Sequence, residues 1–89
     1  MRLACFECAK KHLGQASALI IEAELGYPLH KWLAVGHLAE AEAELIKDHK
    51  DLAIIIRDAR LKYIKGEQID ILDLLGALDD DGLDTNVQG

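Results

Sequence analysis

Aromatic residues and proline are scarce in this sequence. Phe, Trp and Tyr make up 4% of the 89 residues, and Pro28 is the single proline. Strands are enriched in aromatic residues, whereas close-packed helices suit a composition rich in Ala, Leu and Ile. With a hydrophobic fraction of 51%, the chain has enough apolar side chains for one core. The composition therefore predicts a single all-α domain.

The sequence has fewer basic than acidic residues, and it has no long hydrophobic run. Asp and Glu number 16 against 10 Lys and Arg, which gives a net charge of −6. A field of this sign repels phosphate backbones and so disfavours nucleic-acid binding. The apolar stretch Ala16–Ile21 is far shorter than the ~20 residues that a membrane helix needs. We therefore expect a cytoplasmic protein without a signal peptide or membrane segment.

Cysteine is limited to Cys5 and Cys8. Two cysteines so close in sequence cannot close a long loop, so they cannot form the disulfide framework of a small secreted domain. We expect reduced thiols at both positions. Because so short a chain buries only about 60 to 65% of its unfolded surface, a bound metal or a second subunit would add stability.

Apolar residues recur at intervals of three and four in the first half of the chain, which is the spacing of one helix face. This spacing predicts a long helix over residues 3–25 and a second over residues 29–49. Gly26 and Pro28 end the first helix, because Gly accepts the left-handed conformation and Pro cannot continue the hydrogen-bond ladder. The short connection predicts an antiparallel hairpin.

Two shorter helices are predicted after the hairpin. One covers residues 52–64 and stops at Gly66, and the other covers residues 69–78 with Asp70 as its cap. Residues 79–89 offer no apolar face, so we expect a disordered acidic and polar tail. The fold class is therefore a small helical bundle over residues 1–78, made of a long antiparallel hairpin plus two shorter helices.

Apolar side chains cover a broad arc of the second predicted helix. Such breadth indicates packing against more than one neighbour, including a second copy of the chain. We therefore expect a homo-oligomer, a dimer or higher, with any other protein partner unidentified. The residues assigned to this interface are Trp32, Val35, His37, Ala39, Ala43 and Ile46.

Cys5, Cys8 and His12 form a candidate metal site. Thiolate and imidazole are the ligands that zinc prefers, and a helix places these three positions near one face. A closed zinc site needs a fourth ligand. If the hairpin turn is centred near residue 27, His49 lies level with Cys5, whereas His37 lies about 7 to 8 Å further along the axis than His12. His49 is therefore the first choice, and His37 is the alternate ligand.

Two other interpretations of the cysteines remain open. In the first, Cys5 and Cys8 are small buried hydrophobic side chains, since free cysteine is among the most buried residue types. A CxxC near a helix N-terminus also has the lowered thiol pKa that redox chemistry uses. Zinc ribbons and fingers usually present two such pairs, and here there is one. Zinc is thus a candidate cofactor only.

A second polar group runs along the second predicted helix. His30, His37 and Glu44 recur every seven residues, Glu40 lies on the same strip, and Glu22 is expected within about one turn of His30. Ferritin-like carboxylate sites need Glu followed three residues later by His, and the reversed order here disfavours such a site. The strip is either a solvated row of ion pairs or part of a dimer interface with a pH-sensitive His37.

The stretch from Cys5 to Leu45 resembles small uncharacterised helical proteins of bacteriophage and environmental viral sequence. The resemblance is carried by Gly26-Tyr27-Pro28-Leu29-His30 and by Gly36-His37-Leu38-Ala39-Glu40-Ala41-Glu42. It covers about half of the chain and implies a phage or bacterial origin. It implies no activity and assigns no functional residue.

The leading functional prediction is a non-enzymatic helical interaction or oligomerisation module. The alternative is a small zinc-type metal-binding protein that uses the CxxCxxxH cluster of Cys5, Cys8 and His12. No Ser/His/Asp arrangement, phosphate loop or catalytic carboxylate pair supports an enzyme. Glu40 and Glu44 beside His37 are the acid–base candidates for a test of that third possibility.

Overall fold

The computed structural model describes the backbone of residues 4–88 and the side chains of residues 4–79. The chain forms four helices, and no strand occurs within the described range. The prediction of an all-α bundle is therefore confirmed. The helices are α1 (Phe6–Glu24), α2 (His30–Leu45), α3 (Lys50–Ile64) and α4 (Ile71–Gln88).

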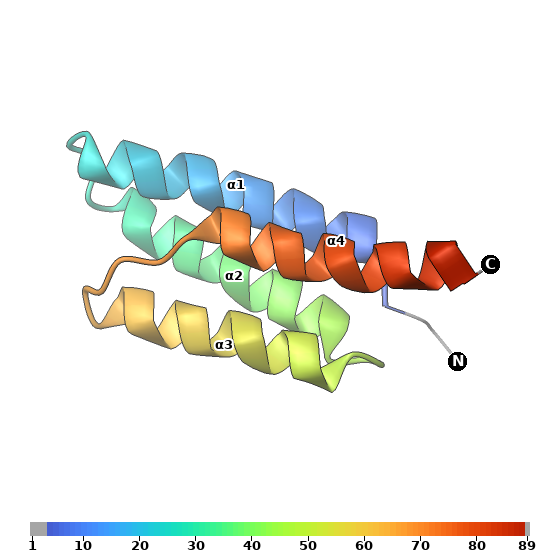
Figure 1. Ribbon diagram of the computed structural model, residues 1–89. Coiled ribbons are helices and arrows are strands. Elements are labelled where there is room, and N and C mark those ends of the chain that lie inside the picture. Colours follow the sequence, from blue (N-terminus) through green and yellow to red (C-terminus); the bar gives the residue numbers. More distant parts are fainter. Residues whose placement is uncertain (1–3, 89) are drawn as a thin grey trace.

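The helices run alternately up and down, so that each is antiparallel to the next in sequence (Figure 1). α1 packs against α2 and α4, and α2 packs against α1 and α3. The α1–α2 hairpin has the most extensive contact, while the seam between α3 and α4 is the loosest. The hairpin predicted from the short Gly26–Pro28 connection is therefore the central unit of the fold.

Glycines end two of the helices as expected. Gly26 has a φ of 124°, and the Tyr27 N–H donates back to the Glu22 carbonyl at 3.2 Å. Gly66 has a φ of 93°, and the Glu67 N–H donates to the Lys62 carbonyl at 3.0 Å. Both are Schellman-type ends, in which the left-handed residue lets the next N–H reach an orphan carbonyl of the last turn.

Side chains cap two helix starts. The Leu72 N–H donates to Asp70 Oδ1 at 2.9 Å, which confirms the predicted cap of α4. At the start of α1, the Cys8 N–H donates to the sulfur of Cys5 at 3.0 Å. The first turn of α1 is therefore fixed by the same residues that form the candidate thiol site.

The core consists of small and branched apolar side chains from all four helices. Ala, Leu and Ile suit this role because their size allows the helices to approach closely without leaving voids. The buried residues are Ala9, Leu13, Ala16, Ala34, Leu38, Ala41, Leu45, Ala53, Ile56, Ile71, Leu74 and Leu78. No charged or polar residue is buried among the described side chains, so ionisable groups lie at the seams and on the outside.

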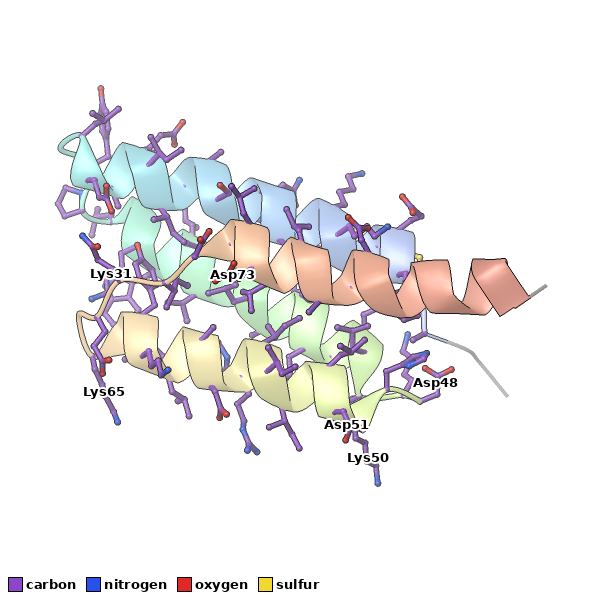
Figure 2. All side chains as sticks on the ribbon, in the orientation of Figure 1. Lys31, Asp48, Lys50, Asp51, Lys65 and Asp73 are labelled. Atoms are coloured by element: carbon purple, nitrogen blue, oxygen red, sulfur yellow. A yellow bond between two sulfur atoms is a disulfide. The ribbon has the colours of Figure 1, made fainter. Side chains whose placement is uncertain are left out.

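The break between the second and third helices differs from the prediction. α2 ends at Leu45 rather than at residue 49, and α3 begins at Lys50 rather than at residue 52. Residues 47–49 are all polar and would bury no apolar side chain in a further turn, and the His49 N–H closes a turn onto the Leu45 carbonyl at 2.7 Å. The side chain of Lys50, which follows this turn, points away from the bundle (Figure 2).

The backbone of α4 continues as a helix to Gln88, beyond the predicted end at Leu78. The predicted tail of residues 79–89 falls mostly on positions whose side chains lie outside the described residues. Among the described helices, none is long and apolar enough to cross a membrane.

Candidate metal centre

A row of imidazole and carboxylate groups follows the seam between α1 and α2. Near the hairpin turn, His30 Nδ1 lies 3.0 Å from Glu22 Oε1, as their spacing predicted. Further along, His12 of α1 meets His37 and Glu40 of α2. The seam therefore holds His30, His37 and Glu40 of the polar strip predicted along the second helix, together with Glu22 and His12 of α1.

His12, His37 and Glu40 bring three ligand atoms to one point, and they are called the His12–His37–Glu40 cluster below. His12 Nδ1 lies 3.1 Å from His37 Nδ1 and 2.9 Å from Glu40 Oε2. His37 Nδ1 lies 3.9 Å from the same Glu40 oxygen. The two imidazole rings are tilted by 30°, with their centroids 5.4 Å apart. One ligand atom from each residue thus lies within 4.8 Å of the other two.

The helices fix these side chains through their buried neighbours. His12 precedes buried Leu13, and His37 precedes buried Leu38, so each imidazole projects from the edge of a packed face. Glu40 lies one turn after His37 on the same strip. Because the core holds the helices in register, the two imidazoles remain opposed across the seam.

The cluster is partly open to solvent. The side chains of His12 and His37 are each 28% exposed, whereas that of Glu40 is 58% exposed. Two neutral imidazole Nδ1 atoms can form a hydrogen bond only if one carries the hydrogen and the other does not. A metal ion removes this restriction, because each nitrogen then donates a lone pair to the ion.

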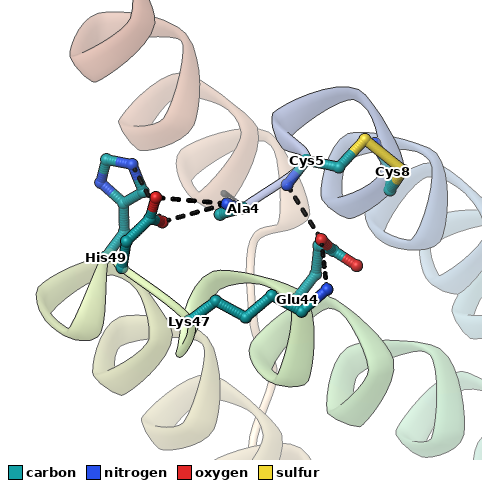
Figure 3. Close-up of polar contacts among 7 residues, drawn as sticks. Ala4, Cys5, Cys8, Glu44, Lys47 and His49 are labelled. Atoms are coloured by element: carbon teal, nitrogen blue, oxygen red, sulfur yellow. Dashed lines mark hydrogen bonds and ion pairs between the residues drawn. A yellow bond between two sulfur atoms is a disulfide. The ribbon is translucent and has the colours of Figure 1, made fainter. Parts of the chain in front are cut away.

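The two cysteines lie at the start of α1 and are joined by a disulfide (Figure 3). Their Cα atoms are 5.2 Å apart, which lies in the usual range for a disulfide. The expectation of reduced thiols was therefore wrong for this structure. One turn of helix is enough to bring two cysteines three positions apart within bonding range.

The segment before α1 is anchored to the end of α2 (Figure 3). The Ala4 N–H donates to both carboxylate oxygens of Asp48 at 3.3 and 3.2 Å. The Cys5 N–H donates to Glu44 Oε1 at 2.9 Å, and Lys47 Nζ lies 2.8 Å from the same oxygen. The disulfide therefore lies beside α2 and is not on a free end of the chain.

The residues predicted as metal ligands do not lie together: some are in the disulfide and others in the His12–His37–Glu40 cluster. Cys5 and Cys8 are bonded to each other, and His12 belongs to the His12–His37–Glu40 cluster. The first-choice fourth ligand, His49, packs its ring edge-on to Phe6 with centroids 4.6 Å apart and lies 3.4 Å from Asp48 Oδ1. The alternate ligand, His37, is the imidazole that meets His12.

Sequence reasoning missed the pairing of His12 with Glu40. The three-residue spacing of His37 and Glu40 had placed both residues on one strip of the second predicted helix. This spacing was the sequence signal that could have suggested the pairing. The estimate that His37 lies too far along the axis counted only backbone rise from an assumed turn centre. The observed contact shows that this estimate was wrong, because the two imidazoles reach each other across the seam.

All of the predicted interface residues except His37 recur at intervals of three and four along one stripe of α2, and none of them is fully buried. Trp32 and Ile46 are 58% and 45% exposed, Ala43 is exposed, and Val35 and Ala39 are half-buried. His37 faces α1 instead. The face of α2 that packs inside the bundle is a different one, formed by Ala34, Leu38, Ala41 and Leu45.

A salt bridge joins α1 to α4 on another side of α1. Lys10 Nζ lies 2.6 Å from Asp79 Oδ1 and 3.5 Å from Glu7 Oε1. The hydrogen bond and charge of Asp79 raise the pKa of Lys10 above its usual value, with a smaller contribution from Glu7. This contact fixes α4 on α1 without involving the His12–His37–Glu40 cluster.

Comparisons with protein families, with curated proteins and with solved structures found no match to this chain. The resemblance to phage-type helical proteins therefore stays a prediction.

Proposed function

We propose that this protein binds a divalent transition metal, of which zinc is the first to test, at the His12–His37–Glu40 cluster. The observation that carries the proposal is the convergence of one atom from each side chain. In a tetrahedral zinc site with bonds of about 2.0 to 2.2 Å, neighbouring ligand atoms are about 3.3 to 3.6 Å apart. The distances of 2.9, 3.1 and 3.9 Å in the cluster bracket these values.

The chemistry of the ligand set also supports the proposal. Two imidazoles and one carboxylate are a set that zinc, iron, nickel and copper accept, and a fourth position remains for water or another ligand. The 58% exposure of Glu40 leaves a route for the ion from solvent. The alternative is a hydrogen-bonded polar cluster without a metal, which the same residues would form at neutral pH.

Zinc titration of the oxidised protein, in competition with a chromophoric chelator, tests the proposal. Wild type is expected to bind one ion per chain. His37→Ala is expected to weaken binding at least about tenfold, which corresponds to about 1.4 kcal/mol. His30→Ala is the matched control, because His30 also pairs with a glutamate on this seam but has no third ligand beside it among the described residues. Equal affinity of wild type and His37→Ala would refute the proposal.

Self-association is a second candidate function, and the exposed apolar side of α2 favours it. Trp32 and Ile46 are about half exposed, and the small side chains of Ala39 and Ala43 lie between them in the sequence. Small residues let a second helix approach closely, and exposed apolar patches often mark protein interfaces. This surface would join two copies of the chain as an oligomerisation module.

Sedimentation analysis at high micromolar concentration tests the second candidate. Ala43→Arg places a charge in the proposed contact and is expected to shift the protein to monomer. Leu72→Arg on α4 is the control, since Leu72 is also an exposed apolar residue, at 75% exposure, but lies on a different helix. A wild-type protein that remains monomeric contradicts the candidate.

A further inference from the structure

We propose that Cys8 is a redox-controlled fourth ligand of the metal centre. In the oxidised protein its sulfur is bonded to Cys5. Reduction of this disulfide releases a thiolate beside His12, which then completes the coordination of the ion. The inference rests on the proposed function, because it requires a metal at the His12–His37–Glu40 cluster.

The placement of Cys8 on α1 carries the inference. Cys8 and His12 are separated by one helical turn, and residues four apart lie on the same side of a helix with their Cβ atoms about 5 to 6 Å apart. This is the spacing at which two side chains of one helix bind a single zinc ion in the HExxH motif. Cys5 lies two turns from His12, which is about 10.5 Å of helix rise.

The other groups near the cluster are already engaged. Glu44, the next carboxylate along α2, accepts the Cys5 N–H and lies 2.8 Å from Lys47 Nζ. His49 contacts the ring of Phe6 and the carboxylate of Asp48. The Cys8 sulfur is therefore the soft ligand that stands one turn from the centre.

The two sulfurs differ in solvent exposure, and this difference indicates which of them a reductant attacks. Cys8 is exposed, whereas Cys5 is half-buried and accepts the Cys8 N–H at the start of α1. An incoming thiolate attacks the accessible Cys8 sulfur, the disulfide bond breaks, and Cys5 leaves as a thiolate. The backbone N–H and the helix N-terminus stabilise that leaving group.

The full reaction balances with a dithiol as the reductant. The first thiolate of the dithiol forms a mixed disulfide with Cys8, and the second displaces it. The dithiol becomes a disulfide, and Cys5 and Cys8 become two thiols. Cys8 then loses its proton to solvent as its sulfur bonds to the metal. Two electrons pass from the dithiol to the protein disulfide, and the metal keeps its oxidation state.

Linkage makes the effect reciprocal. If reduction tightens metal binding, the metal favours the dithiol form by the same free energy. Oxidation would then loosen the ion, and loss of the ion would favour reformation of the disulfide. The site would release or capture the metal according to the thiol redox state of its surroundings.

Two serine variants separate the roles of the cysteines. Both Cys5→Ser and Cys8→Ser abolish the disulfide, but Cys5→Ser leaves the Cys8 thiol available at all times. Serine is also a good helix cap, so Cys5→Ser keeps the start of α1. Zinc affinity is measured for wild type and both variants, with and without a dithiol reductant, and helicity is checked by circular dichroism.

Reduction is expected to tighten zinc binding by wild type at least about tenfold, or about 1.4 kcal/mol. Cys5→Ser is expected to bind as tightly as reduced wild type in the absence of reductant. Cys8→Ser is expected to bind as weakly as oxidised wild type in either condition. With cobalt as the probe, a thiolate-to-metal charge-transfer band is expected for Cys5→Ser and not for Cys8→Ser.

The inference is overturned if reduction leaves wild-type affinity unchanged, or if Cys8→Ser binds as tightly as Cys5→Ser. If His37→Ala still weakens binding in that case, the proposed function stands without the redox control. If Cys5→Ser and the double variant Cys5→Ser/His37→Ala bind zinc equally well, the thiolate holds the ion at a site that does not include His37. Both proposals then fail.

Discussion

Tyr63 lies near the end of α3, beside Glu24 of α1 and Lys31 of α2. Burial raises the pKa of Tyr63 above the usual 10.0, and the charge of Glu24 raises it further. Lys31 Nζ lies 5.4 Å from the ring centroid, so the aromatic face also has a cationic neighbour. The folded protein therefore holds the phenol proton more tightly than the unfolded chain does. Deprotonation of Tyr63 at alkaline pH consequently lowers the free energy of unfolding.

The pH dependence follows from the sign of that shift. The contribution of Tyr63 to the free energy of unfolding is complete below pH 10.0 and falls as the pH rises through the raised pKa. Chemical denaturation at several alkaline pH values checks this. Tyr63→Phe lacks an ionisable phenol, so its stability is expected to fall less steeply above pH 10. Parallel curves for the two proteins would contradict the expectation.

Arg60 and Glu42 form the closest ion pair between α3 and α2. Arg60 Nη2 lies 2.6 Å from Glu42 Oε1, and both side chains are about four-fifths buried. Arg60 Nε is buried without a hydrogen-bond partner among the described residues. If the Glu42 carboxylate is removed, little water can therefore reach the Arg60 guanidinium to replace the lost hydrogen bond.

Glu42→Ala is expected to lower the free energy of unfolding by about 1.5 to 3 kcal/mol, the usual range for a hydrogen bond to a charged group. The control is Asp58→Ala, which removes an exposed partner 3.9 Å from Arg57. That surface pair is expected to contribute less than about 1 kcal/mol. Urea denaturation compares the two, and similar losses would count against this account of the α2–α3 seam.

The candidate site could be predicted from sequence in part. Glu22 and His30 were expected to meet, since both lie near a turn whose position Gly26 and Pro28 make clear. His12 and His37 were predicted as ligands but were not paired, because the register of two helices far from their turn depends on core packing. The disulfide was missed because composition alone gives no account of local helix geometry.

Glycines in helix interiors provide a test at the scale of the element. Gly14 of α1 and Gly36 of α2 have open space where a Cβ would lie. Alanine removes the entropic penalty of glycine in a helix, so Gly14→Ala and Gly36→Ala are each expected to stabilise the protein by about 0.5 to 1 kcal/mol. Thermal unfolding followed by circular dichroism measures the gain.

Gly26→Ala is the contrasting variant in that experiment. Space is equally open at Gly26, but its φ of 124° is a conformation that alanine rarely adopts. This variant is therefore expected to destabilise the hairpin. A gain in stability at Gly26, or a loss at both helix-interior positions, would show that backbone conformation does not control these effects.

Helix ends were easier to predict than helix faces. Gly26, Gly66 and Asp70 act locally, and each ends or caps a helix where expected. The buried face of α2 depends on where α1 and α3 lie, which the broad apolar arc could not reveal. The arc alone therefore did not show that Leu38 and Leu45 are fully buried while Trp32 and Ile46 are about half exposed.

At the scale of the whole molecule, the metal centre would join two parts of one cooperative unit. The His12–His37–Glu40 cluster takes its ligands from α1 and α2, the two helices with the most extensive contact. The unfolded chain cannot hold these three side chains together without closing a loop of residues 12–40. An ion bound there therefore stabilises the folded state selectively.

Zinc is accordingly expected to raise the thermal unfolding midpoint of the oxidised protein. At a free zinc concentration of about 100 times Kd, the gain is about 2.7 kcal/mol if the unfolded chain has no affinity for the ion. His37→Ala should lose this zinc-dependent shift, while His30→Ala should retain it. Magnesium, which prefers oxygen ligands in an octahedral shell, should have little effect at the same concentration. If zinc shifts His37→Ala as much as wild type, the ion acts elsewhere on the chain.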